Sequence, residues 1–221
     1  MKRLASIACA LGSVFLAVIL TACGGSYKGT INYVAPPDSP AETERCTQPI
    51  TVLPFTDARP YHDIYVNRVG ELKGGFGEVF RSVDLKDSVS LETSKAFASF
   101  LKDKGCLVSS GQPEVKDGVT LSGTLNDFFG VVFWVIKIGI DVDLKLTDNA
   151  TGKELWKGKL LREFGGALGG QYPNLKKDHG IDCSLGYECS ARYLNAGINE
   201  MYAEGMREVW DKNGLKDVLA K

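Results

Sequence analysis

Few stretches of this sequence combine residue types and spacing that could do chemistry. The run LKGGFGEVF, from Leu72 to Phe80, approaches the spacing of a glycine-rich loop whose backbone amides cover the phosphates of ATP. Leu72 stands where that loop needs its first glycine, no His-Arg-Asp catalytic run follows, and no Gly-Lys-Ser/Thr phosphate loop occurs in the chain. We therefore expect no bound nucleotide.

Two carboxylates, Asp141 and Asp143, are the remaining candidates for catalysis. They are two residues apart in an alternating segment, so on a strand they share one face. Such a pair could serve a hydrolase acting on cell-wall or glycan material, although the same pair is common on the solvated side of a sheet. His62 and His179 are too few for a histidine triad or a three-histidine zinc site. We expect no catalytic residue, no cofactor and no enzyme activity, with the hydrolase as the alternative.

The N-terminus predicts export from the cytoplasm. Lys2 and Arg3 precede an almost wholly apolar run from Leu4 to Leu20. The end of this run, Leu20-Thr21-Ala22-Cys23, resembles the bacterial lipobox, which implies that residues 1–22 are a lipoprotein signal peptide and that Cys23 receives a diacylglyceryl group. A retained transmembrane helix is the alternative.

By this resemblance, two or three fatty acyl chains, such as palmitate, attach the mature protein to a membrane through Cys23. No aspartate follows Cys23, which favours the periplasmic face of the outer membrane. Removal of residues 1–22 takes away Lys2 and Arg3 and no acidic residue, so the formal net charge changes from -1 to -3. This composition does not favour nucleic-acid binding.

Four cysteines besides Cys23 remain after processing, and an even number in the oxidising periplasm predicts disulfides. Cys183 and Cys189 enclose a short glycine-containing turn, which leaves Cys46 to pair with Cys106. The latter two stand at the starts of predicted strands, and neighbouring parallel strands would bring those starts together. Free buried thiols are one alternative. A metal site is the other, formed by His179, Asp182, Cys183 and Cys189.

The composition divides the mature chain into a lipidated flexible tether, residues 23–45, and one periplasmic domain, residues 46–221. The tether is rich in glycine, serine, proline and charge. In the domain, periodicity and turn residues predict helices at about 88–104 and 191–212, short strands at 50–55 and 106–109, and a strand at 119–127 that leads into an antiparallel meander ending near 163.

Three segments are less regular. Residues 60–87 are expected to be an irregular loop with a short strand near 78–83, and residues 165–190 a glycine-rich excursion. The apolar run from Phe128 to Ile136 fits either a strand buried on both faces or an edge that contacts a membrane or a partner.

The order of these features resembles the YajG-like family of bacterial outer-membrane lipoproteins. The resemblance covers about residues 46–213 and includes the lipobox at Cys23, Asp57-x-Arg59 after the first strand, the isolated Gly70, the Thr151-Gly152-Lys153 turn and the terminal helix opened by Leu194-Asn195. It implies a fold and an envelope location, and no particular activity.

These observations lead to one expectation for the fold and one for the function. We expect an α+β domain with a mixed, largely antiparallel sheet of about five to six strands, and two main helices packed on one face. The leading function is that of a non-enzymatic, lipid-anchored envelope lipoprotein that binds another envelope component, protein or glycan, or assists its assembly.

Overall fold

The computed structural model describes residues 25–33, 46–111, 117–133, 135–167 and 187–220. The signal peptide, Cys23, Cys183 and the side chain of Cys189 lie outside the described residues, as does the proposed ligand set around His179.

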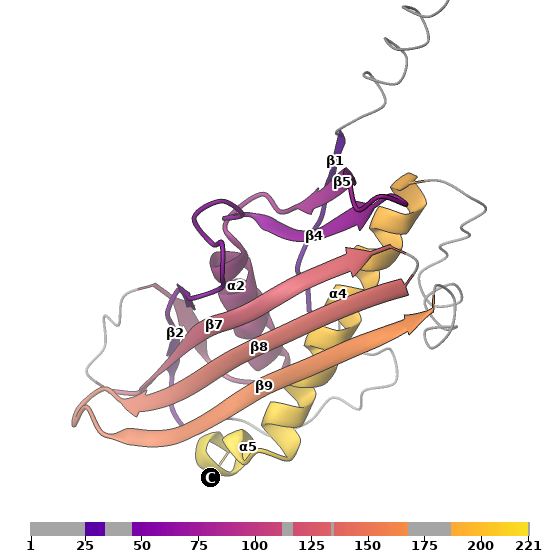
Figure 1. The fold of residues 1–221 in the computed structure, drawn as a ribbon. Helices are drawn as coiled ribbons and strands as arrows, with labels where there is room; N and C mark the ends of the chain where they lie inside the picture. Colours follow the sequence, from indigo (N-terminus) through magenta and orange to yellow (C-terminus); the bar gives the residue numbers. More distant parts are fainter. Residues whose placement is uncertain (1–24, 34–45, 112–116, 134, 168–186, 221) are drawn as a thin grey trace, which may run out of the picture.

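A nine-stranded mixed sheet organises these residues. Its longest ladders are antiparallel and join β7 (Val119–Val132), β8 (Val135–Asp148) and β9 (Glu154–Ala167) in the expected meander (Figure 1). The β8–β9 turn falls at Asp148–Lys153, where the Asp148 carboxylate accepts hydrogen bonds from the amide and hydroxyl of Thr151 at 2.7 Å. Gly152 has a positive φ of 69° there, a conformation that glycine adopts at little cost.

The other edge of β7 carries three short parallel strands in succession: β2 (Ile50–Val52), β3 (Thr56–Asp57) and β4 (Arg68–Lys73). β6 (Val108–Ser110) lies parallel to β2, as expected across a helical crossover. β4 forms an antiparallel hairpin with β5 (Val79–Asp84), and β1 (Gly25–Lys28) lies parallel to β5.

Two long helices, α2 (Val89–Asp103) and α4 (Tyr187–Asp211), cover one face of the sheet, and short α5 (Leu215–Leu219) follows them (Figure 1). Ser88 caps α2 by accepting the Leu91 amide, and Gly105 ends it with a positive φ of 78°. The helices contact each other through edge-to-face packing of Phe100 on Trp210.

Two glycines let α4 approach the sheet closely. A Cβ atom on Gly70 would lie 2.7 Å from Leu194 Cδ2 and 2.9 Å from the carbonyl oxygen of Gly130. A Cβ atom on Gly130 would also lie 2.7 Å from Leu194. Glycine at these positions therefore sets the depth at which α4 packs over β4 and β7.

The expected fold class is confirmed: a mixed α+β domain with a large sheet and two substantial helices on one face. The sheet has more strands than expected because β1, β3 and β4 are short and lack strong alternation. Cys46 and Cys106 form a disulfide with their Cα atoms 4.7 Å apart, and they precede the parallel strands β2 and β6, as anticipated.

The expected flexible tether is wrong for residues 25–33, which are part of the domain. β1 pairs with β5, Ile31 is only 2% exposed, and the amide of Thr30 donates to Asn195 Oδ1 at 3.0 Å. Residues 25–33 are held by one buried apolar side chain and by side chains of α4. They therefore lack the repeated apolar pattern from which a strand can be predicted.

Two other boundaries also differ from expectation. Residues 60–87 contain β4 as well as the expected β5, so the stretch is largely a hairpin. β9 continues to Ala167 because Gly165 and Gly166 remain paired with Lys137 and Ile136. The apolar run is divided between buried strand residues, Phe128 and Val132, and the exposed Val135 at the β7–β8 turn.

Ile31→Ala should lower the free energy of unfolding by about 2–4 kcal/mol, because it removes a fully buried side chain from the core. Urea unfolding of the protein and the variant measures this difference. Thr30→Ala, an exposed neighbour whose backbone amide makes the bond to Asn195, is the control and should change stability by less than about 0.5 kcal/mol. Equal, negligible effects would show that residues 25–33 do not pack on the domain.

Candidate functional site

An extra length of chain builds a wall beside β7. Gly70 of β4 lies thirteen positions after Asp57 of β3, whereas their partners on β7, Leu125 and Gly130, are five positions apart. The surplus residues cannot follow the strand, so they form a loop, residues 58–67, that projects on the face of the sheet opposite the helices (Figure 1).

The Arg59 guanidinium holds this loop in place. Its side chain is 5% exposed and makes a two-point ion pair with Asp57, with Nε and Nη2 each 2.9 Å from a carboxylate oxygen. The remaining N–H groups donate to the carbonyl oxygens of Tyr65 and Arg68 at 3.1 Å, and of Val66 and Phe128 at 3.4 Å. The Asp57-x-Arg59 pattern therefore bridges the loop to β7, which is a structural role.

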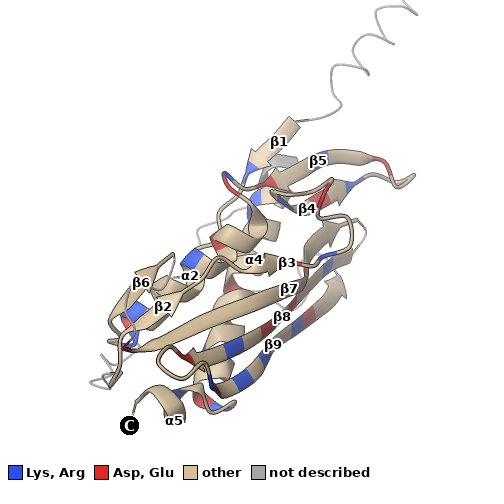
Figure 2. Ribbon diagram, turned by 90° about the vertical axis from the view of Figure 1, so that its left-hand side faces the viewer, with Lys and Arg blue, Asp and Glu red and all other residues tan. Residues whose placement is uncertain are grey.

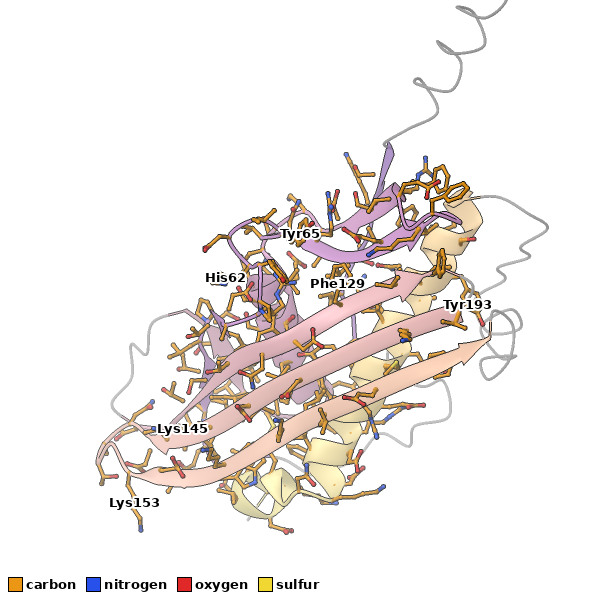
Figure 3. All side chains as sticks on the ribbon, viewed as in Figure 1. His62, Tyr65, Phe129, Lys145, Lys153 and Tyr193 are labelled. Carbon is orange, nitrogen blue, oxygen red and sulfur yellow. A yellow bond between two sulfur atoms is a disulfide. The ribbon has the colours of Figure 1, made fainter. Side chains whose placement is uncertain are left out.

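The loop and four strands enclose a depression of about 840 Å³, here called the outer-face hollow. Its lining combines aromatic rings with side chains of both charges. The lining residues include Tyr61 and Tyr65 of the loop, Glu71 and Lys73 of β4, Asp127 and Phe129 of β7, Lys137 and Gly139 of β8, and Glu163 of β9. Figure 3 shows Tyr65 and Phe129 on this face of the sheet.

A β-bulge turns Asp127 into the outer-face hollow. Strict alternation from Val119 through Leu125 would place residue 127 on the core face, but the β7–β8 register shifts between Leu125 and Asp127. Gly139 then makes room, because a Cβ atom there would lie 2.7 Å from Asp127 Oδ2. The register also places Gly139 between Phe129 and Glu163, so the missing side chain deepens the floor.

Burial among the walls raises the pKa of Asp127 above its ordinary value, although solvent reaches the carboxyl group. The neighbouring charges of Asp141 and Glu163 raise the pKa further, while a hydrogen bond from the Phe128 amide and the Arg59 charge oppose the rise. At the β4 wall, the buried Glu71 lies 3.2 Å from Arg68 Nη1 and 3.4 Å from Lys73 Nζ. The outer-face hollow thus holds carboxylates in different electrostatic environments.

This arrangement suits a polar ligand with apolar faces. Aromatic rings offer flat contact surfaces, while the carboxylates and lysines offer acceptors and donors at the rim. Among the described residues, no group of three or more histidine, cysteine, aspartate or glutamate side chains is placed to hold a metal ion. In the same part of the chain, no helix is long and apolar enough to cross a membrane.

The two carboxylates singled out from the sequence lie beside the outer-face hollow and do not line it. Asp141 pairs with Lys159 Nζ at 2.9 Å, and Asp143 accepts the Asn126 amide at 2.8 Å. They belong to the open face of β8 and β9, where charged residues of both signs lie along the strands (Figure 2). The glycine-rich run Leu72–Phe80 covers the end of β4, the β4–β5 turn and the start of β5.

Sequence reasoning missed Asp127, Glu163, Tyr65 and Phe129 as site residues. One signal was available for Asp127, since a charge falls at a core-facing position of an otherwise regular alternation. The other three carry no such mark, because their convergence depends on strand register and on the path of the loop.

Some solved structures resemble this chain, although no protein-family model matches it and no curated protein matches it. A Xanthomonas campestris protein of family DUF330 superposes with a TM-score of 0.52 and 12% identity, over 87% of this chain and 98% of its own. A Helicobacter pylori homolog of neuraminyllactose-binding hemagglutinin gives 0.40 and 10%, over 81% and 94%. A Neisseria meningitidis lipoprotein gives 0.33 and 16%, over 60% and 90%. The first likeness shows a shared fold.

Arg59→Lys should lower the free energy of unfolding by about 2–4 kcal/mol, because an ammonium group cannot replace both the two-point pair with Asp57 and the carbonyl bonds. Arg68→Lys is the control, since Arg68 is 28% exposed and its guanidinium donates to Glu71 and Asp84 by single contacts, so its loss should be smaller. Urea unfolding gives both values, and an equal loss in the two variants would contradict the role given to Arg59.

Asp127→Asn should increase stability at pH 7. The folded pKa of Asp127 is raised, so the native state holds its proton to higher pH than the unfolded chain does, and stability falls as pH rises through that window. The neutral variant escapes this loss, and its advantage should vanish below about pH 4, where the unfolded carboxyl is also protonated. Denaturation curves at pH 7 and pH 3 measure the difference, and a variant less stable at pH 7 would refute the prediction.

Proposed function

We propose that this chain is a lipid-anchored bacterial envelope protein without catalytic activity that binds an envelope glycan in the outer-face hollow. The observation that carries the proposal is the construction of that hollow, in which a buried arginine, a β-bulge and a floor glycine all serve to hold aromatic and charged side chains around one open space. Binding sites commonly have this combination of a concave shape, aromatic walls and few converging polar groups.

The anchor and the location form the second part of the proposal. The lipobox-like sequence before Cys23 supports acyl chains on that residue, and the resemblance to the YajG-like family supports the periplasmic face of the outer membrane. The disulfide between Cys46 and Cys106 fits an oxidising compartment.

A glycan fits the lining better than a protein segment does. Sugar rings have apolar faces that stack on rings such as Tyr65 and Phe129, and hydroxyl groups that donate to carboxylates such as Asp127 and Glu163. A protein partner would be expected to bury about 800 Å² of this chain, a wider surface than one hollow offers.

A hydrolase is the second candidate, and one observation favours it. Asp127, with a raised pKa, lies near the carboxylates Asp141 and Glu163, and glycosidases use one protonated and one ionised carboxyl group. In this role Asp127 would be the acid. The pair Asp141 and Asp143 is a weaker choice, because Lys159 and Asn126 hold these side chains on the open face.

Binding of cell-wall glycan fragments to the full lipidated chain in detergent micelles tests the proposal. Calorimetry should detect binding, and Asp127→Asn should weaken it at least tenfold because the variant loses a charged acceptor. Asp143→Asn makes the same chemical change on the same face outside the outer-face hollow, and it should leave the affinity unchanged.

Product analysis of the same mixtures separates the two candidates. Intact fragments after long incubation agree with a binding protein. Cleavage that disappears in Asp127→Asn would replace the binding proposal with the hydrolase, and affinity equal in all three proteins would remove the outer-face hollow as the site.

A further inference from the structure

The chain enters its first strand from one particular end of the molecule. β1 begins at Gly25, which is paired with Arg81, and it runs in the same direction as β5. The strand is therefore entered from the side of Val79, the first residue after the β4–β5 turn. Only Gly24 lies between Cys23 and Gly25, so the Cα atoms of these two residues are at most about 7 Å apart. A lipid on Cys23 would hold this end of the domain at the membrane surface.

Two turns at this end expose apolar side chains. Phe76 at the β4–β5 turn is 100% exposed and Val79 is 42% exposed, while Val135 at the β7–β8 turn is 38% exposed. The turns are neighbours because β4 lies parallel to β7, with Leu72 beside Val132. Gly77 of the first turn and Phe133 and Val135 of the second line one shallow depression of about 270 Å³. The two turns thus form one surface.

The β4–β5 turn is built to hold Phe76 outward. The Gly74 amide donates to the Glu78 carbonyl at 2.9 Å, the Gly77 amide donates to the Gly74 carbonyl at 2.9 Å, and the Phe76 amide donates to the Glu78 carboxylate at 2.9 Å. Gly77 has a φ of 85°, which only glycine adopts without strain. Because these bonds fix the backbone of the turn, only the side-chain rotamers of Phe76 lose freedom on contact with another surface.

Cationic side chains lie beside the apolar residues. Lys137 of β8 is exposed, and Lys73 and Arg81 lie at the bases of the β4–β5 turn. The acidic residues nearby are Glu78, which is exposed in the turn, and Glu71, which pairs with Lys73 at 3.4 Å. Apolar side chains flanked by lysine and arginine are typical of surfaces that lie in the interface of a bilayer with anionic headgroups.

We propose that the β4–β5 turn around Phe76 and the β7–β8 turn around Phe133 and Val135 form a membrane-contact edge that rests on the phospholipid surface beside the anchor at Cys23. The inference rests on the lipid anchor of the proposed function and adds an orientation to it. Lys73 and Lys137 belong both to this edge and to the outer-face hollow. The outer-face hollow would consequently open close to the headgroups, and the β8–β9 turn would point away from the membrane.

Photocrosslinking tests this edge in the lipidated full chain. The photoreactive residue p-benzoylphenylalanine replaces Phe76, and the protein is placed in vesicles of phosphatidylethanolamine and phosphatidylglycerol. The control position is Leu107, which is 74% exposed and precedes β6, at the Val119 end of β7 far from both turns. Mass spectrometry of the protein first verifies the acyl chains on Cys23 and then detects phospholipid adducts.

The expected result is a phospholipid adduct at position 76 at least tenfold more abundant than at position 107. Equal yields at the two positions in a protein with acylated Cys23 would overturn the membrane-contact edge and leave the anchor intact. An unacylated Cys23 would overturn both. The same variants irradiated in cells address the other class of partner, because a protein adduct at position 76 in place of a lipid adduct would show that the edge is a protein interface.

Discussion

The ion pair between Arg59 and Asp57 is the interaction on which the outer-face hollow depends. The buried guanidinium of Arg59 donates to the Asp57 carboxylate and also to carbonyl oxygens of the loop, β4 and β7. Without these bonds, the carbonyl oxygens of Tyr65, Arg68 and Phe128 would lose a shared donor. The loop would then keep only its backbone bonds, among them those from the Leu85 and Val89 amides to the Asn67 and Val66 carbonyls. The wall that carries Tyr61 and Tyr65 therefore owes its position to two charged residues, neither of which needs to touch a ligand.

The depth of the site depends on a second constraint, which is how closely α4 on one face and the Asp127 carboxylate on the other can approach the backbone of the sheet. On the helix side, Gly70 and Gly130 admit Leu194 of α4. On the open side, Gly139 admits the Asp127 carboxylate, and the β-bulge after Leu125 supplies that carboxylate. A larger residue at Gly70 or Gly130 would displace α4, and one at Gly139 would fill the floor of the outer-face hollow. Side-chain size around β7 is therefore restricted on both faces of the sheet.

Sequence patterns predict the parts of this fold whose signal is local and repeated. Helix α2, with its Ser88 cap and Gly105 terminator, and the β8–β9 turn at Asp148–Lys153 follow from residue type and period. The parallel neighbours β2 and β6, with the disulfide at their starts, follow from the crossover rule. The site is different, because Glu163 and Phe129 meet across two strand registers and Tyr65 arrives through a loop whose path Arg59 determines. Short strands such as β1 are set by partners far along the chain, and no period within four residues can reveal them.

The parallel pairing of β1 with β5 also decides how the domain withstands a pull. A force applied through the N-terminus acts along the axis of β1. It therefore loads the hydrogen bonds between β1 and β5 together in shear, and they do not break one after another. The bond from the Gly29 amide to the Asp84 carbonyl at 2.9 Å, the Asn195 bond to Thr30 and the buried Ile31 lie behind that ladder and would be loaded next. Mechanical strength is thus concentrated at Gly25, where the described chain enters the domain through β1.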